Sequence, residues 1–345
     1  MGVVLGIESS CDETAAALVT SDRTIIAQAV ASQDEAHAPY GGVVPEIAAR
    51  AHAERLAPMV EAVMRDGGME LADLDAIAAT AGPGLIGGVM VGLVTAKALA
   101  MAADVPLMAI NHLEGHALSP RLADPALKFP YALLLVSGGH CQILRVEGVG
   151  VYRRYATTID DALGEAYDKT AKILGLDFPG GPAVERLACE GDPRAVPLPR
   201  PLVGSGEPHF SFAGLKSAVL RAHQSGLHAD ADIAASFQQA AIDCVVDRLN
   251  LALRSMGEVG ALVVAGGVAA NAAMREALNT LAAQHHLGFS APPPALCTDN
   301  AAMIAWAGQE RLALGIPGDP LDIAARPRWP LDPAAEPVRG AGVKA

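Results

Sequence analysis

The chain begins with two apolar runs separated by a small polar turn. The runs cover Val3 to Glu8 and Ala15 to Val19, and this pattern predicts a β-hairpin whose turn exposes backbone N–H groups. The same pattern returns at Tyr131 to Val136 and Cys141 to Val146. Two hairpins of one design indicate a chain built from two duplicated lobes.

Glycine-rich turns connect two further predicted strands to predicted helices. Gly82 to Gly88 follows a buried strand at Ala76 to Thr80, and Gly266 to Ala270 follows one at Ala261 to Ala265. Such a turn places helix N-terminal amides where they can bind an anion. Glycines at this place also serve close packing of a helix on a sheet, so each turn alone leaves both functions open.

One apolar stretch, from Leu85 to Ala103, approaches the length of a membrane span. Three glycines and Lys97 interrupt it, so it predicts a helix buried inside the protein and no membrane association. The chain enters its first strand without a basic leader segment, so we expect a cytoplasmic protein. An apolar fraction of 51% over 345 residues allows a large core distributed over two lobes.

Charge and cysteine usage exclude several classes of function. The net charge of −13 argues against a broad nucleic-acid-binding surface, although a local basic patch or a partner can supply one. The five cysteines are scattered without a C-x-x-C pair. They therefore indicate neither a zinc knuckle nor a disulfide framework.

Two histidines, His112 and His116, are spaced by one helical turn after a predicted strand at Leu107 to Ile110. On a helix both imidazoles would lie on one face and could hold one metal ion. The alternative is a pair of partly buried histidines bonded to backbone or water. Glu114 lies at neither position that a metallopeptidase uses for its base, H-E-x-x-H or H-x-x-E-H.

Several segments together match the motifs of one family in order. They are Gly6–Thr14, Gly41–Glu46, Ala81–Leu85, His112–His116, Val136–His140, Asp168–Lys169, Pro179–Pro182, Gly266–Asn271 and Cys297–Asn300. From about residue 2 to residue 328 the chain resembles the TsaD (Gcp/YgjD) family of tRNA N6-adenosine threonylcarbamoyltransferases. So many motifs in matching order are far more specific than any one of them.

The resemblance implies a two-lobed α/β fold of the actin and sugar-kinase (ASKHA) superfamily, with duplicated lobes around a central cleft. We expect residues 1–108 in lobe I, with 301–330 returning to it, and 109–300 in lobe II with the metal and nucleotide motifs. Residues 331–345 would form a flexible tail. The implied activity is transfer of the threonylcarbamoyl group from threonylcarbamoyl-AMP to N6 of adenosine 37 in tRNAs that read ANN codons.

The resemblance also implies the site residues. The metal ligands would be His112, His116 and Asp299, and the ion would be Fe(2+), with zinc as the alternative. Asp299 by itself is more typical of a helix cap than of a ligand. The substrate phosphate would lie beside a turn formed by Leu135, Val136, Ser137, Gly138 and Gly139. The ribose and adenine would be held by Asp168, Gly181, Glu185 and Asn271.

Chemistry adds a general base, and the resemblance adds partners. The attacking adenine amine loses a proton, so Asp12 or Glu13 in the first hairpin turn is our candidate to accept it, although a carboxylate there can equally cap a turn. The expected partners are tRNA, the related subunit TsaB, bound through helices of the first lobe, and the ATPase TsaE.

Three other functions compete with this interpretation. An ATP-dependent phosphotransferase of the same superfamily would need both hairpins but not His112 and His116, because magnesium prefers oxygen ligands. A metallopeptidase would need a glutamate beside the histidines. A noncatalytic scaffold would not need the two histidines together with Asp299.

Overall fold

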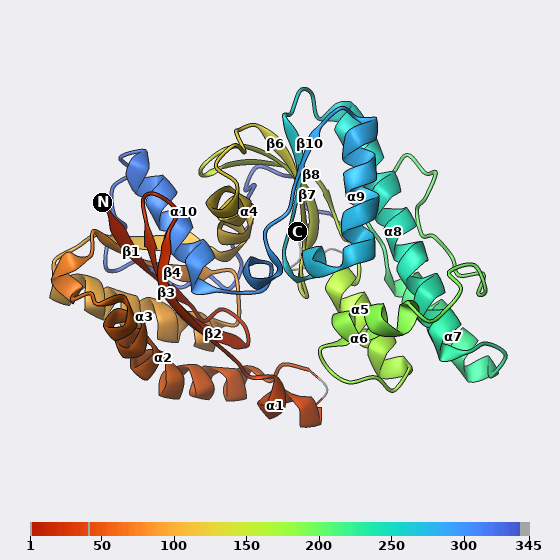
Figure 1. Cartoon of the computed structure of the whole chain (residues 1–345), viewed down its shortest axis with the longest axis horizontal. Coiled ribbons are helices and arrows are strands. Elements are labelled where there is room, and N and C mark those ends of the chain that lie inside the picture. The colour runs from red at the N-terminus through yellow and green to blue at the C-terminus, as the bar shows by residue number, and fades with distance from the viewer. Residues whose placement is uncertain (1, 41, 339–345) are drawn as a thin grey trace. The chain divides into compact units, whose positions relative to one another are not determined.

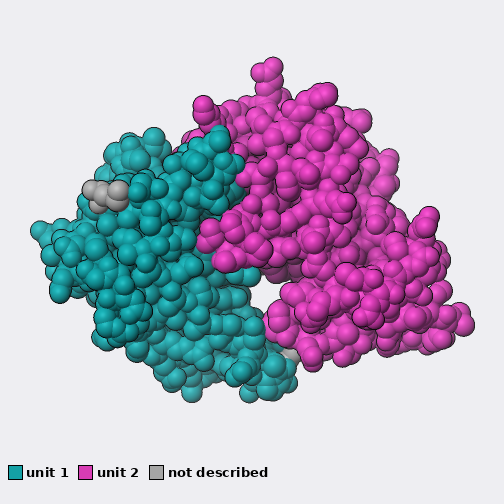
Figure 2. Space-filling model, in the orientation of Figure 1, with its two compact units in different colours: residues 1–126, 298–333 teal, residues 127–297, 334–345 magenta. Residues whose placement is uncertain are grey.

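The computed structural model describes residues 2–40 and 42–338 of the chain. Gly41 of the second motif and residues 339–345 of the expected tail lie outside the described residues. The chain divides into two compact units (Figure 2), Met1–Ala126 with Thr298–Pro333 and Leu127–Cys297 with Ala334–Ala345. The expected boundary at 108/109 thus falls inside the first unit, because helix α4 (His112–Ala123) packs on α10 (Ala301–Ala313). The metal motif consequently belongs with the first hairpin and not with the nucleotide motifs.

The first unit is built on a five-stranded mixed sheet in the order β3-β2-β1-β4-β5. Its strands are β1 (Val3–Glu8), β2 (Glu13–Thr20), β3 (Ile25–Ser32), β4 (Ala76–Gly82) and β5 (Leu107–Asn111). The first three pair antiparallel, and β4 and β5 run parallel to β1. The predicted hairpin and both predicted strands after it are confirmed.

The second unit repeats this sheet. Its strands are β6 (Tyr131–Val136), β7 (Cys141–Gly148), β8 (Val151–Thr157), β9 (Ala261–Ala265) and β10 (Gly288–Ser290). They lie in the order β8-β7-β6-β9-β10, with two antiparallel pairs followed by two parallel ones. The order and the pairing directions match those of the first unit, so the predicted duplication is confirmed.

Helices cover both faces of the first sheet (Figure 1). Long apolar side chains of β1 and β4 pack against α2 (Pro45–Gly67) and α3 (Ile86–Ala103). On the opposite face, α10 crosses β1 and β2, and α4 packs beside it. The short helix α1 (Asp34–His37) follows β3. The core of this unit therefore consists of two layers, one on each face of the sheet.

Helix α3 differs from the buried helix that its sequence predicts. It is long and apolar enough to cross a membrane, but only 33% of its 18-residue window is buried. One face packs against β4 and α2. The other exposes large apolar side chains, namely Ile86, Met90, Val94 and Met101. Periodicity alone could not detect this, because the helix is apolar on all sides.

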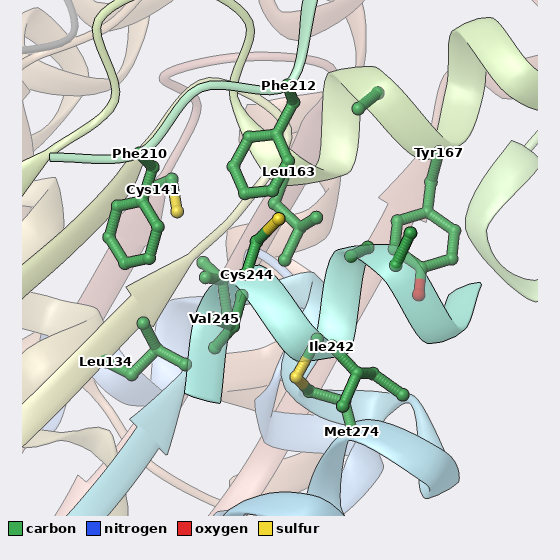
Figure 3. Packing of buried hydrophobic residues seen from close by; sticks show 14 of the residues in the cluster. Leu134, Cys141, Leu163, Tyr167, Phe210, Phe212, Ile242, Cys244, Val245 and Met274 are labelled. Atoms are coloured by element: carbon green, nitrogen blue, oxygen red, sulfur yellow. The ribbon is translucent and has the colours of Figure 1, made fainter. Parts of the chain in front are cut away.

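The second unit packs its helices around α8 (Asp230–Ser255). These are α5 (Leu163–Ile173), α6 (Gly180–Ala188), α7 (Ala213–Ser225) and α9 (Ala272–Gln284). Figure 3 shows the rings of Phe210, Phe212 and Tyr167 in the core beside α8. The Tyr167 ring meets Phe237 edge to face at 5.0 Å. The motif Asp168–Lys169 lies on α5, and the motif Pro179–Pro182 continues into α6.

Candidate active site

The histidine pair lies at the start of α4, where the chain leaves β5. Asn111 caps this helix by accepting a hydrogen bond from the Leu113 N–H at 2.9 Å, and its amide donates to the Trp329 carbonyl oxygen. His112 and His116 are both buried on one helical face, with ring centroids 4.8 Å apart. The helical spacing predicted for the pair is confirmed.

Asp299 approaches the same point from the start of α10. Its carboxylate Oδ1 lies 3.0 Å from His116 Nε2 and 3.5 Å from His112 Nε2. The cap of α10 is the neighbouring residue, since Asn300 accepts from the Met303 N–H at 2.9 Å. The ligand atoms of the three residues all lie within 4.8 Å of one another.

Two glycines allow α10 to bring Asp299 this close. A Cβ on Gly6 of β1 would overlap the Ala301 carbonyl oxygen and lie 2.7 Å from the Ala305 nitrogen. A Cβ on Gly115 of α4 would lie 2.7 Å from Ile304 Cδ1. Helix α10 is therefore packed against backbone on both sides, which fixes the position of its N-terminus.

Two imidazoles and one carboxylate fit a divalent transition metal. This donor set, with further coordination positions left for oxygen ligands, is typical of non-haem iron(II) and is also compatible with zinc. The three predicted ligands are thus brought together in one unit by two helices and the loop before α10.

The Glu8 carboxylate contacts the His112 ring, with Oε2 2.9 Å from Nδ1. Burial by itself would raise the pKa of Glu8, but its contact with His112 outweighs burial and lowers the pKa overall. Burial likewise opposes the charged form of His112, whereas Asp299 and Glu8 raise its pKa to about 9. The Glu8 carboxylate and the His112 ring therefore stabilise each other's charge.

Glu114, between the two histidines, serves another purpose. Its carboxylate Oε2 lies 2.6 Å from an Arg311 guanidinium nitrogen of α10, and both side chains are largely buried. The arginine also donates to the Ala109 carbonyl oxygen at 3.1 Å. Glu114 thus ties α4 to α10, which agrees with its absence from the positions of a peptidase base.

The turn between β1 and β2 carries the two candidate bases. Burial, then Asp299, then Asp12 raise the pKa of Glu13 to about 10. Asp12, Glu13 and Asp299 therefore interact electrostatically within one acidic cluster. His52 of α2 holds the turn in place. Its Nε2 lies 3.1 Å from the Cys11 carbonyl oxygen, and its Nδ1 lies 2.8 Å from the Thr14 hydroxyl.

In the second unit, the turn after β6 presents backbone. Leu135 and Val136 are fully buried strand residues, so accessible groups at this turn begin at Ser137. The Ser137 N–H donates to the His140 carbonyl oxygen at 2.8 Å, which closes the turn. An added Cβ on Gly138 or Gly139 would meet nothing within 4 Å. The turn therefore leaves open space above its two glycines.

The remaining predicted substrate residues tie loops and helix ends together nearby. Asp168 of α5 accepts from the Gly180 N–H at 3.0 Å, beside Gly181 at the start of α6. Glu185 of α6 accepts from the Ala272 N–H at 2.7 Å. Asn271 caps α9 through the Met274 N–H and donates to Gln238. Contacts of the 3-10 turn Gly267–Ala270 with β6 and α5 join these residues to the Ser137 turn.

The sequence alone gives Glu8 and Thr80 no function. The signal was a carboxylate that ends an otherwise apolar strand, because a buried carboxylate needs partners. Those partners are far away in sequence, and only the sheet register places Thr80 beside Glu8.

Comparisons with known proteins support the resemblance over the whole chain. The family model of TsaD, described as tRNA N6-adenosine threonylcarbamoyltransferase, matches residues 24–306. A protein of that name from Erythrobacter litoralis is 78% identical over 345 residues, covering all of both chains. Another from Novosphingobium aromaticivorans is 75% identical over 351 residues, again covering all of both chains.

Solved structures agree on the fold. HypF from T. kodakarensis matches with a TM-score of 0.61 at 15% identity, covering 90% of this chain and 48% of that one. Component A of the (R)-2-hydroxyglutaryl-CoA dehydratase of Acidaminococcus fermentans matches with a TM-score of 0.56 at 17% identity, covering 91% and 100%. The predicted two-lobed α/β fold is confirmed. The chain belongs to the TsaD family of tRNA N6-adenosine threonylcarbamoyltransferases.

Proposed function

We propose that the chain transfers the threonylcarbamoyl group from threonylcarbamoyl-AMP to N6 of adenosine 37 in tRNAs that read ANN codons. The observation that carries the mechanistic part of this proposal is the convergence of two imidazoles and one carboxylate on one point. Family membership supplies the reaction and its tRNA substrate.

His112, His116 and Asp299 would hold one divalent ion, iron(II) in our proposal, with zinc as the alternative. Such an ion supplies Lewis acidity and a fixed orientation for the substrate carbonyl. The donor set supports this choice, because His112 and His116 each direct Nε2 to the same carboxylate oxygen. The ion pair of Glu114 with Arg311 disfavours a hydrolytic role for the centre.

The second unit would bind the adenylate. Main-chain groups of residues 135–139 would hold the phosphate and stabilise the AMP that leaves, since Gly138 and Gly139 have open space above them. Asp168, Gly181, Glu185 and Asn271 would hold ribose and adenine. Their hydrogen bonds to the starts of α6 and α9 support this, because they fix these side chains around the same turn.

Asp12 and Glu13 are our candidates for the group that accepts the proton of the adenine amine. Asp12 lies in the β1–β2 turn and Glu13 begins β2. The pKa of Glu13 responds to Asp299, so the pair is close to the metal ligands. A carboxylate there is suitably placed for general base catalysis. With a pKa of about 10, however, Glu13 is protonated at neutral pH, so it could accept a proton only after a bound ion has offset the charge of Asp299.

Two protein partners complete the proposal. Helix α3 of the first unit exposes large apolar side chains at helical spacing, namely Ile86, Met90, Val94 and Met101. Such a stripe is typical of a protein interface, and we assign it to TsaB. TsaE would act with this complex, and the cytoplasm, where tRNA is modified, would be its location.

The decisive experiment measures modified nucleosides by mass spectrometry after incubating tRNA, threonylcarbamoyl-AMP and the purified protein, with and without TsaB and TsaE. We expect threonylcarbamoyladenosine with the wild type and none with His112→Ala or His116→Ala, each still folded. His285→Ala is the matched control, because the one bond described for that ring goes to the half-buried Asn250 in the second unit. Full activity in either site variant would contradict the metal assignment.

A further inference from the structure

Glu8 is a carboxylate with no solvent exposure at the end of β1. Its Oε1 accepts a hydrogen bond from the Ser10 N–H at 2.6 Å. Its Oε2 accepts from the Thr80 hydroxyl at 2.5 Å and lies 2.9 Å from His112 Nδ1. A buried carboxylate is stable only with such a full set of donors. Three elements, β1, β4 and α4, therefore meet at this one side chain.

This arrangement decides which nitrogen of His112 is available to a ligand. A neutral imidazole has one N–H donor and one lone pair, and an ionised carboxylate only accepts. Since Glu8 occupies the Nδ1 side, the neutral ring, which is the form that can bind a metal, carries its proton on Nδ1 and its lone pair on Nε2. That Nε2 is the atom 3.5 Å from Asp299 Oδ1. The Ser10 hydroxyl, 3.1 Å from the same Nδ1, can donate or accept and so selects neither tautomer.

We propose that Glu8 is a positioning residue of the metal centre, which holds the His112 ring and tautomer so that Nε2 faces the ion. The inference rests on the proposed function in that it requires the cluster of His112, His116 and Asp299 to bind a metal. A carboxylate behind a ligating histidine also increases the basicity of the ligand nitrogen.

The two histidines differ in this respect. Among the described residues His116 Nδ1 is buried without a hydrogen-bond partner, whereas His112 Nδ1 has Glu8. The effect of altering Glu8 should therefore be confined to His112. This asymmetry separates a specific positioning role from a general loosening of the site.

Glu8→Gln tests the role with minimal change of shape. Both oxygens of Glu8 accept hydrogen bonds, but an amide has only one oxygen. If its NH₂ faces His112, the ring must accept at Nδ1 and carry its proton on Nε2, which then cannot bind a metal. If its NH₂ faces the Ser10 N–H, two donors oppose each other. Either arrangement weakens the presentation of Nε2.

The first measurement is the affinity of the purified full chain for Zn²⁺, obtained by competition with a chromogenic chelator. Zinc is the probe because it is diamagnetic and does not oxidise. We expect Glu8→Gln to weaken binding by about 10- to 100-fold, the range typical of partners behind metal ligands. Thr80→Val, which removes a donor to the same carboxylate, should cost about threefold or less, because the His112 bond remains.

Glu114→Gln is the matched control on α4 itself. It makes the same carboxylate-to-amide change at a buried position, but the bond described for this carboxylate goes to Arg311. The Gln carbonyl oxygen can still accept the Arg311 hydrogen bond, so α4 stays on α10: the melting temperature should fall with the lost ion pair while zinc affinity stays within about twofold. If Glu8→Gln bound zinc like the wild type, the proposal would be overturned.

A second measurement on the wild type does not depend on the folding of any variant. Long-range ¹H–¹⁵N spectra of the zinc-loaded, histidine-labelled protein report which nitrogen carries the proton. His112, assigned by comparison with His112→Gln, should show an Nδ1 proton and a metal-bound Nε2. Metal on Nδ1 would overturn the proposal.

Two ligand variants separate failure of this inference from failure of the metal centre. If His116→Gln and Asp299→Asn abolish zinc binding but Glu8→Gln does not, the metal centre stands and the role of Glu8 falls. If neither ligand variant changes zinc binding, both proposals fall. Loss of affinity in all three, with Glu114→Gln unchanged, supports both.

Discussion

The two units place different chemistry on the same sheet. Their parallel pairs align Ile7–Ala79 of the first unit with Leu135–Ala265 of the second. The next residues are Glu8 and Thr80 in one unit, and Val136 and Gly266 in the other. In the first unit the two side chains hydrogen-bond. In the second, the strand ends approach so closely that a Cβ on Gly266 would overlap the Val136 carbonyl oxygen.

This difference teaches how one sheet can serve two ligands of opposite charge. Where side chains fill the strand end, as with Glu8, an acceptor is available to orient a histidine toward a cation. Where glycine replaces them, as at Gly266, the strand end offers no side-chain acceptor, which would suit the anion that we propose for the glycine turn beside it. In this proposal the strand order sets the place of each site, and the residue after the last strand pair sets the charge of the ligand that the site would take.

The same alignment also contrasts how helices approach each sheet. Gly6 of β1 lies against the backbone of α10, whereas the equivalent Leu134 of β6 contributes a side chain to the core of the second unit. The first unit thus exchanges a core side chain for close approach of the helix that positions Asp299.

Gly6→Ala should have the largest effect. The added methyl group would overlap the Ala301 carbonyl oxygen and cannot be accommodated by a side-chain movement. We expect a loss of about 3 kcal/mol or more in the free energy of unfolding, together with loss of zinc binding. Urea unfolding and chelator competition measure the two quantities.

The comparison variant is Leu134→Ala, at the equivalent place in the second unit. It should destabilise by about 2 to 5 kcal/mol through a cavity, but leave zinc affinity intact in the folded fraction. Equal loss of zinc binding in both variants would contradict the special role of Gly6.

Gly266→Ala comes next. Its φ of +93° and its contact with Val136 both oppose a side chain, so we expect a loss of about 2 kcal/mol. Displacing the strand end should also weaken AMP binding, measured by calorimetry. Gly148→Ala is the control, because a Cβ there would meet nothing within 4 Å and the residue lies at the end of β7, outside the glycine turns. Unchanged behaviour of Gly266→Ala would show that the close approach does not matter.

The sequence predicts some of these features and not others, for physical reasons. Apolar runs separated by short polar turns predict both hairpins, because this signal lies within one continuous segment of the sequence. Asp299 was identified only through the family resemblance, since Asn300 beside it is an equally good cap and in fact caps α10. The boundary at 108 was misplaced because contacts of α4 with α10 join segments far apart in sequence. Glu8 gained a role only from the register that places Thr80 and His112 around it.

Gly115→Ala should have a smaller effect, because the atom it would meet is the mobile end of a side chain. Its Cβ would lie 2.7 Å from Ile304 Cδ1. Alanine favours the helix by about 1 kcal/mol, and this gain partly offsets the clash, so we expect a net loss of about 1 kcal/mol. Zinc affinity should fall modestly as α4 moves from α10.

Adding Ile304→Val to Gly115→Ala provides the control, since it removes the Cδ1 atom itself. The double variant should regain zinc affinity relative to Gly115→Ala alone. If it did not, the packing of α4 on α10 would not be what sets the ligand geometry.

Gly138→Ala and Gly139→Ala should have the smallest effect on stability and so give the sharpest test of the second unit. A Cβ at either position meets nothing within 4 Å, so unfolding should change by about 0.5 kcal/mol or less. If the open space above the turn is filled by a phosphate, the methyl group competes with it, and AMP binding should weaken by about tenfold. Gly148→Ala, equally unobstructed but at the far end of β7, should change neither quantity. Unaltered AMP binding in both turn variants would mean that the glycines of the second unit shape a turn and hold no anion. The proposed contrast in ligand charge between the two units would then rest on the metal centre alone.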